Sequence, residues 1–421
     1  MMSGRIIRKG KKYERNRLLN KELEKQLNNL IKVDGKYKIN EIRYAIEALT
    51  NHNSSMSWVN ELETRFSEKL GVRHAIACNS GTSGLHAALY AADIGPGDEV
   101  IIPALTVIMD AYPVLHLGGI PIFADVCENT HLISVDEIRR KITPKTKAII
   151  TVAWEGLSCD MDPILKIAND NNITVIDDSA RNILGKYRSS YAGTLADINV
   201  YSFEAKKHMT AGGEGGMIIT NNSVLAQKIR KFSGIGYRHL SADAGRTHLA
   251  ISEVQDPNYL RFDTIGLNYR MNDISAAIAL GQLERIDEIV SNRKIVAQLF
   301  IDAMNNCEWL IPQHVPEGYE HSYYTVAADY KGEDQIGVSW KEFYNKYIEM
   351  GGDGFYSVVA IPYLEPSLRG KVIGDQSCEP GLCPISERLQ KRVMCFKTNY
   401  RDLKVAQNKA KILNQLIKAF S

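Results

Sequence analysis

The sequence predicts an α/β protein with a mostly parallel sheet and helices on both faces, followed by a smaller C-terminal α+β domain. From about residue 60, short apolar runs alternate with helical patterns, which is typical of parallel strands joined by crossover helices. The strand pattern thins out after Asn222. A chain of 421 residues is also too long for one compact core, so we expect two domains with a cleft between them.

The expected strands are short, rich in β-branched residues and bounded by turn residues. They cover residues 75–78, 100–102, 120–123, 148–152, 174–176, 198–201 and 217–220. Helical patterns lie between several of them, at residues 83–92, 135–141 and 161–171. In the smaller domain we expect a long amphipathic helix over 273–290, a strand over 323–326 and a closing helix over 404–420.

These patterns divide the chain into a basic N-terminal arm over residues 1–39, a large domain over 40–255 and a small C-terminal domain over 256–421. The first 17 residues carry seven basic side chains and one acidic one. A solvated arm is the expected reading of this charge run, and contact with an anionic partner is the alternative.

Composition excludes several classes of function. The chain has 51 Lys and Arg against 49 Asp and Glu, and a net charge of +2 gives no electrostatic case for nucleic acid. Its longest charge-free apolar run, 100–109, is about half of what a membrane helix needs. The seven cysteines are scattered and no secretory leader is visible, which predicts reduced thiols in a cytoplasmic protein. Cys378 and Cys383 lie close together but lack the two further ligands of a structural zinc site, so no metal is expected.

A phosphate-binding segment is predicted at Asn79-Ser80-Gly81-Thr82-Ser83-Gly84, between the strand at 75–78 and a helix. Glycine permits close backbone approach, the hydroxyls donate hydrogen bonds, and a helix amino end attracts phosphate. An ordinary helix capped by a hydroxyl residue is the alternative.

Asp178 ends an apolar strand, where a bare carboxylate is costly unless a cation or donors meet it. A ring nitrogen that carries a proton would meet it, because a neighbouring carboxylate stabilises the protonated ring. Strand alternation turns Asp177 to the opposite face. Ligands of parallel sheets bind at the carboxyl ends of the strands, where Asn79, Asp178 and Ser202 are expected to meet. A capping or loop role is the alternative for Asp178.

Lys207 lies between Ser202, a natural phosphate donor at a strand end, and the glycine-rich turn at 212–216. Near cationic groups, such a lysine has a lowered pKa, so that its neutral amine is available as a nucleophile and a proton shuttle. A lysine, an aspartate and phosphate-cradling groups are what an enzyme needs to hold pyridoxal phosphate (PLP) as a Schiff base. For any single lysine, the alternative is an ordinary charged side chain at the protein surface without a catalytic role.

The motifs at 81–83, 178–180, 202–207 and 268–271 together resemble the DegT/StrS-type sugar aminotransferases, PLP enzymes of fold type I. Their order and spacing agree over roughly residues 40 to 400, and connecting stretches such as 95–100 match as well. The resemblance makes the large domain the PLP-binding domain.

The resemblance implies a role for each matching residue. Lys207 forms the Schiff base, and Asp178 meets the pyridine nitrogen. The phosphate end of the cofactor is implied to bind the segment and strand end formed by Gly81, Thr82, Ser83 and Ser202. Asn268 reaches the phosphate of the neighbouring subunit, so a homodimer with shared sites is expected. The implied reaction moves an amino group from glutamate or glutamine to a keto group of a nucleotide-linked sugar.

Two departures from the family pattern affect the cofactor site. Arg181 stands where the family usually has Gln, His or Glu near the cofactor's phenolic oxygen. An arginine there is expected to bind this oxygen and hold it as phenolate. Val107 occupies the position where many relatives place an aromatic ring over the cofactor. Trp154 either compensates for it or is a core tryptophan.

A third departure is one extra residue between Lys207 and Glu214. Counting back from the glycine turn puts His208 at the catalytic position, where related sugar dehydratases carry histidine. Counting forward from Ser202 gives Lys207, which we adopt, with the extra glycine in the turn. His208 is then a packing residue or a substrate contact.

Three alternatives stay open beside the sugar aminotransferase. They are a keto-cyclitol acceptor, a PLP-dependent sugar dehydratase and a PLP-binding protein without turnover. Lys207 disfavours the dehydratase. The basic arm and residues Arg261, His321 and Tyr323 are candidates to face the sugar nucleotide, and a buried His-Tyr strand is the alternative for the last two.

Overall fold

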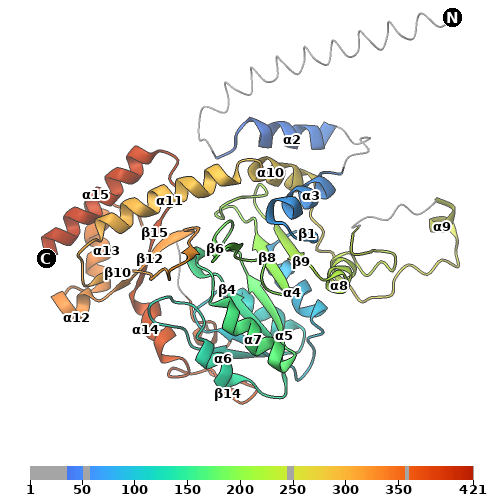
Figure 1. Cartoon of the computed structure of the whole chain (residues 1–421), viewed down its shortest axis with the longest axis horizontal. Coiled ribbons are helices and arrows are strands. Elements are labelled where there is room, and N and C mark those ends of the chain that lie inside the picture. Colours follow the sequence, from blue (N-terminus) through green and yellow to red (C-terminus); the bar gives the residue numbers. More distant parts are fainter. Residues whose placement is uncertain (1–35, 51–56, 244–250, 356–359, 421) are drawn as a thin grey trace, which may run out of the picture.

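A seven-stranded sheet lies at the centre of the large domain (Figure 1). The computed structural model describes residues 36–50, 57–243, 251–355 and 360–420, so most of the predicted basic arm lies outside the described residues. The strands are ordered β1-β9-β8-β5-β4-β2-β3. Their bounds are β1 (His74–Cys78), β2 (Glu99–Pro103), β3 (Ile120–Ala124), β4 (Thr146–Val152), β5 (Thr174–Asp178), β8 (Ile198–Ser202) and β9 (Gly216–Thr220).

In this sheet β9 is antiparallel to both its neighbours, and the other pairings are parallel. The mostly parallel sheet and all seven expected strands are therefore confirmed. Because β1, β5 and β8 run in the same direction, their carboxyl ends lie at one edge of the sheet. Asn79, Asp178 and Ser202 stand at those ends, as the sequence predicts.

Helices cover both faces of the sheet. Successive residues of β1 divide between two cores, since Ile76 packs in one cluster and Ala75 and Ala77 in the other. The helices of the large domain are α2 (Ile39–Thr50), α3 (Trp58–Leu70), α4 (Gly81–Ala91), α5 (Tyr112–His116), α6 (Val135–Lys141), α7 (Met161–Asn171), α8 (Ser223–Ser233) and α9 (Ile251–Gln255), with the 3-10 turns η2 (Ile108–Asp110) and η3 (Trp154–Gly156).

The C-terminal part is an α+β unit with its own core. An antiparallel sheet of order β10-β12-β15 packs against three helices. The helices and main strands from residue 273 onward are α10 (Asp273–Leu283), α11 (Ile286–Ala303), β10 (Leu310–Pro312), β12 (Thr325–Tyr330), α12 (Gly332–Ile336), α13 (Trp340–Glu349), η4 (Pro362–Leu364), α14 (Pro384–Arg392), β15 (Val393–Lys397) and α15 (Leu403–Phe420). Short strands complete the fold, namely β6 (Lys186–Tyr187), β7 (Ser190–Tyr191), β11 (Tyr319–Glu320), β13 (Val372–Ile373) and β14 (Gln376–Ser377).

The single helix expected over 273–290 is wrong, because the chain forms α10 and α11 with a break between them. Arg285 leaves the helical region at φ −121°, and its Nε donates to Glu41 Oε1 at 2.8 Å. The break lets α10 pack against α2 and α3, while α11 continues into the small domain beside α15 (Figure 1). The domain boundary expected after residue 255 stays a prediction, and α10 shares a core cluster with α3.

The strand expected from Tyr323 begins two residues later, at Thr325. Tyr323 has φ 50°, a left-handed conformation that cannot continue an extended strand. The closing helix expected over 404–420 is confirmed, and it begins one residue earlier, at Leu403. No helix in the part of the chain that the structure describes combines the length and the apolar character needed to cross a bilayer.

Candidate active site

The amino end of α4 lies against the end of β8. A Cβ atom added to Gly81 would be 3.0 Å from Ser202 Cβ, so a larger residue would crowd this contact between helix and strand. Ser202 Oγ accepts a hydrogen bond from the Glu204 N–H at 3.3 Å, which leaves its hydroxyl proton for another acceptor. Thr82 is exposed at the same helix end. The arrangement offers backbone N–H groups, a helix dipole and two hydroxyls to an anion, which suits a phosphate.

Ser83 does not join this group, although the sequence places it among the cofactor ligands. Its N–H donates to Ser80 Oγ at 3.1 Å, and its hydroxyl donates to Asn79 Oδ1 at 2.6 Å. Both polar groups of Ser83 are therefore used in the cap of α4. The alternative of a capped helix is therefore realised, and Ser83 shapes the helix end, while phosphate binding at this end stays a prediction.

Asp178 is buried at the end of β5. Its Oδ1 accepts a hydrogen bond from the Ala180 N–H at 2.8 Å. Burial raises the pKa of Asp178, and the Ala180 N–H and the cations Lys207 and Arg181 oppose that rise. Asp177 faces the other way and accepts from the Thr151 hydroxyl at 2.6 Å, as strand alternation predicts. A cationic ring nitrogen would add to the groups that keep Asp178 ionised.

Lys207 lies on the loop that leaves β8. Its Nζ is 5.1 Å from the ring centroid of Tyr324. Burial, and then the nearby Arg181 guanidinium, lower the pKa of Lys207 to about 8. A substantial fraction of this amine is therefore neutral near physiological pH, as a nucleophilic lysine requires.

His208 points elsewhere. It is buried, and its Nε2 lies 3.0 Å from the backbone oxygen of Ser322. The extra glycine of the turn lies in open space, since a Cβ added to Gly213 would meet no atom within 4 Å. These positions support the alignment that assigns the catalytic place to Lys207. The assignment itself stays a prediction.

Arg181 forms an ion pair with Glu155, a residue that no predicted motif includes. Glu155 is fully buried and also accepts a hydrogen bond from Thr325 Oγ1. The Arg181 guanidinium carbon lies 4.2 Å from the ring centroid of Trp154. Trp154 is itself buried, so it is a core residue that supports Arg181 through a cation–π contact. The available signals were Arg181, which departs from the family pattern, and Trp154, which directly precedes Glu155.

Two further neighbours were missed. Tyr324 lies beside both cations, with its ring centroid 5.3 Å from the Arg181 guanidinium carbon. Asp110, at the end of η2, is a second fully buried carboxyl group next to Asp178. The signal for Asp110 was an acid directly after the apolar run at 100–109, in a segment that follows a strand end.

The residues proposed to face a sugar nucleotide fall into two groups. His321 is buried and stacks on Tyr323 with ring centroids 4.0 Å apart, and its Nε2 lies 3.1 Å from Gln313 Oε1. The alternative of a buried His-Tyr strand is only partly met, because His321 is buried while Tyr323 is partly exposed and neither residue belongs to a strand. Arg261 is partly exposed and donates to the backbone oxygen of Tyr259 at 3.0 Å.

Asn268 is exposed near the end of β1. Its backbone oxygen accepts from Asn79 Nδ2 at 3.5 Å, and its Oδ1 accepts from Arg270 Nε at 3.1 Å. It therefore lies at the edge of the site, on a segment that faces outward. Its predicted contact with the neighbouring subunit stays a prediction.

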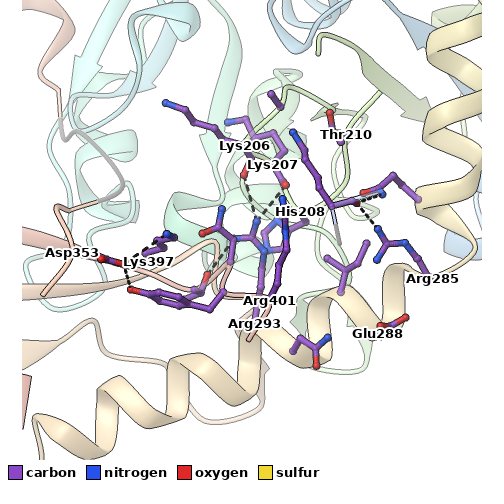
Figure 2. A pocket seen from close by; sticks show the side chains of 18 of the residues that line it. Lys206, Lys207, His208, Thr210, Arg285, Glu288, Arg293, Asp353, Lys397 and Arg401 are labelled. Carbon is purple, nitrogen blue, oxygen red and sulfur yellow. Dashed lines mark hydrogen bonds and ion pairs between the residues drawn. The ribbon is translucent and has the colours of Figure 1, made fainter. Parts of the chain in front are cut away.

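A basic cavity of about 900 Å³ opens beside Lys207 (Figure 2). Eight lysine and arginine side chains line it against two acidic ones. Figure 2 shows Arg293 donating to the backbone oxygens of Lys206 and Lys207, at 3.4 and 3.3 Å. The basic residues are Lys36, Lys38, Lys206, Lys207, Arg285, Arg293, Lys397 and Arg401. Among the described residues, no group of three His, Cys, Asp or Glu side chains could hold a metal ion.

The sheet order, the lysine loop and the aspartate at the end of β5 define the class of PLP-dependent enzymes with the aminotransferase fold. The family model for the DegT/DnrJ/EryC1/StrS aminotransferase family matches residues 36–406. The chain therefore belongs to this family, and the family, the fold class and the enzyme class predicted from the sequence are confirmed.

Curated relatives and a solved structure agree with this assignment. The GDP-perosamine synthase of Caulobacter vibrioides is 42% identical over 260 residues, which are 61% of this chain and 65% of that enzyme. The chain thus matches just under two thirds of this relative's length. The GDP-perosamine synthase of Escherichia coli O157:H7 is 36% identical over 65% of this chain and 70% of that enzyme. The aminotransferase from Psychrobacter cryohalolentis superposes with a TM-score of 0.80 at 27% identity, over 91% of this chain and 96% of that one.

Proposed function

We propose that this enzyme transfers an amino group from glutamate or glutamine to a keto group of a nucleotide-linked sugar, with PLP attached at Lys207. The observation that carries the proposal is the lysine amine of lowered pKa, about 8, at the sheet edge that also presents the buried Asp178. The two GDP-perosamine synthase relatives support a GDP-linked sugar as the acceptor.

The residues at this sheet edge fit PLP, and each would hold a different part of it. PLP, when bound, supplies an aldehyde for attachment to an amine and a ring that withdraws electrons. Ser202, Thr82 and the amino end of α4 would hold its phosphate, and the Asp178 carboxylate would hold the proton of its ring nitrogen. The Lys207 amine would act as the base that takes the proton from the substrate carbon bearing the amino group, and would then hold that proton for return.

The basic cavity supports an anionic substrate. Its excess of positive side chains would attract the diphosphate of a sugar nucleotide and raise its local concentration beside Lys207. Lys207 and Lys206 both line this cavity, so a ligand held there lies next to the proposed catalytic loop. The cavity would attract glutamate or glutamine less strongly than a diphosphate, because an amino acid carries fewer negative charges.

A homodimer with shared sites is part of the proposal. The segment that leads to Asn268 exposes the large apolar side chains Leu260, Phe262 and Ile265, the last at 93%. Figure 1 shows this segment, together with α9, extending away from the large domain. Exposed apolar side chains gathered on one projecting segment are typical of an interaction surface. An Ile265→Asp variant is expected to have a lower mass in light scattering after gel filtration, and an unchanged dimer would contradict this interface.

Incubation with glutamate tests the reaction. The PLP-loaded enzyme should lose its visible absorbance and gain the absorbance of the amine form of the cofactor. A panel of nucleotide keto sugars, with GDP-linked sugars first, should then restore the visible absorbance and yield an amino sugar. Lys207→Ala should abolish both steps, and Lys166→Ala, at an exposed lysine of α7 paired with Asp170, serves as the control. Formation of a deoxygenated keto sugar without nitrogen would identify the dehydratase alternative instead.

A further inference from the structure

A second buried carboxyl group, that of Asp110, lies next to Asp178. Asp110 stands at the end of η2, after β2, and has no exposed surface. The Thr106 hydroxyl donates a hydrogen bond to its Oδ2. The order β5-β4-β2 brings the carboxyl ends of β2 and β5 to the same sheet edge, and there the carboxyl groups of Asp110 and Asp178 are within hydrogen-bond reach of each other. Neither the family motifs nor the predicted site includes Asp110.

Two adjacent buried carboxyl groups cannot both be ionised at little cost, so one of them holds a proton. Asp178 is the better anion, because it accepts a hydrogen bond from the Ala180 N–H and lies near the cations Lys207 and Arg181. Asp110 Oδ1 is buried and accepts no hydrogen bond from the described residues. Burial and the Asp178 carboxylate raise the pKa of Asp110 well above its usual range. These contacts favour Asp110 Oδ1 as the atom that holds the proton of the pair.

We infer that Asp110 is a positioning residue for the PLP ring: it stays protonated at neutral pH and donates a hydrogen bond from Oδ1 to the Asp178 carboxylate. The bond from Thr106 to Oδ2 orients the group for this donation. The inference rests on the proposed function only in that Asp178 meets the ring nitrogen. Because a donated hydrogen bond stabilises an anion, Asp178 binds the ring proton less strongly than a carboxylate without that bond.

The first test needs no cofactor. Infrared difference spectra of the cofactor-free protein at pH 8 should contain the carbonyl band of a protonated carboxylic acid, and this band should be absent from Asp110→Asn. Asp177→Asn is the matched control, because burial raises the pKa of Asp177 only to about 6 and this group is ionised at pH 8. A wild-type spectrum without the band, or a band that persists in Asp110→Asn, would overturn the inference.

The second test reads the ring nitrogen directly. Nitrogen NMR of the protein loaded with ring-labelled PLP should give the same titration midpoint for wild type and Asp110→Asn, whose amide keeps a donor. In Asp110→Ala the midpoint should rise by about one pH unit, a tenfold change, since one charge-assisted hydrogen bond is lost. A midpoint in Asp110→Ala equal to that of wild type would refute the role. If Asp110→Ala does not fold, the infrared comparison alone decides.

The two tests separate this inference from the proposed function. Failure of PLP to attach at Lys207 would refute the proposed function while the infrared band still reports the protonation of Asp110. Loss of the band in the wild type with normal attachment of PLP would refute the inference alone.

Discussion

The guanidinium group of Arg181 is paired with the buried carboxylate of Glu155, and the pair lies within the electrostatic surroundings of Lys207. The side chain of Glu155 is fully buried and that of Arg181 is 11% exposed. Removal of one partner therefore leaves a charge in a poorly solvated place. The pair explains how an arginine fits where the family carries smaller or neutral side chains.

Glu155→Gln should lower the free energy of unfolding by about 3 kcal/mol, because the Arg181 charge loses its buried partner. Chemical denaturation measures the effect. Glu128→Gln is the matched control, since Glu128 pairs with Arg388 at the surface and such pairs contribute at most about 1 kcal/mol. If both variants lose the same free energy of unfolding, the buried Arg181–Glu155 pair contributes no more to stability than a surface pair.

Arg181→Gln should raise the midpoint at which the visible absorbance of bound PLP titrates, by on the order of one pH unit. The guanidinium favours the ionised phenolic oxygen, and a neutral amide does not. A spectrophotometric pH titration measures the shift. Arg188→Gln, at an exposed arginine paired with Asp162, is the control and should leave the midpoint in place. An unchanged midpoint in Arg181→Gln would show that Arg181 does not bind the phenolic oxygen of PLP.

The rate of PLP attachment should rise with pH through about 8 and then level off, because the neutral Lys207 amine is the reactive form and its pKa is lowered to about 8. An ordinary lysine, with a pKa of 10.5, would still gain reactivity well above that range. Stopped-flow absorbance gives the rate. Borohydride reduction and peptide mass spectrometry should place the label on Lys207, with Lys206→Arg as the control. A label on any other lysine contradicts the assignment.

Gly81→Ala should weaken PLP binding about tenfold, which corresponds to about 1.4 kcal/mol. The new Cβ would stand 3.0 Å from Ser202 Cβ and would push the amino end of α4 away from the strand end. Calorimetric titration of the cofactor-free protein measures the affinity. Gly95→Ala is the control, because its nearest neighbour, Asp98 Oδ2, is 3.9 Å away. Affinity equal to wild type in Gly81→Ala would argue against a phosphate held at this contact.

Much of the fold follows from local signals. The seven strands of the large sheet and the helices α4, α6 and α7 appear where apolar period and turn residues predict them. The break at Arg285 does not follow from such signals, because the residues on both sides favour a helix. It arises where the arginine side chain binds Glu41, which is 244 residues away along the chain.

The sequence by itself determined which side chains stand at the strand ends, because a parallel sheet brings its carboxyl ends to one edge whatever the loops do. On that ground the positions of Asp178, Ser202 and Lys207 along the chain are enough to group them in one site. Only the tertiary structure decided which polar groups meet one another there. Asp110 meets Asp178, and Glu155 meets Arg181, through contacts between separate loops, and the protonation state of each group depends on burial and on these neighbours.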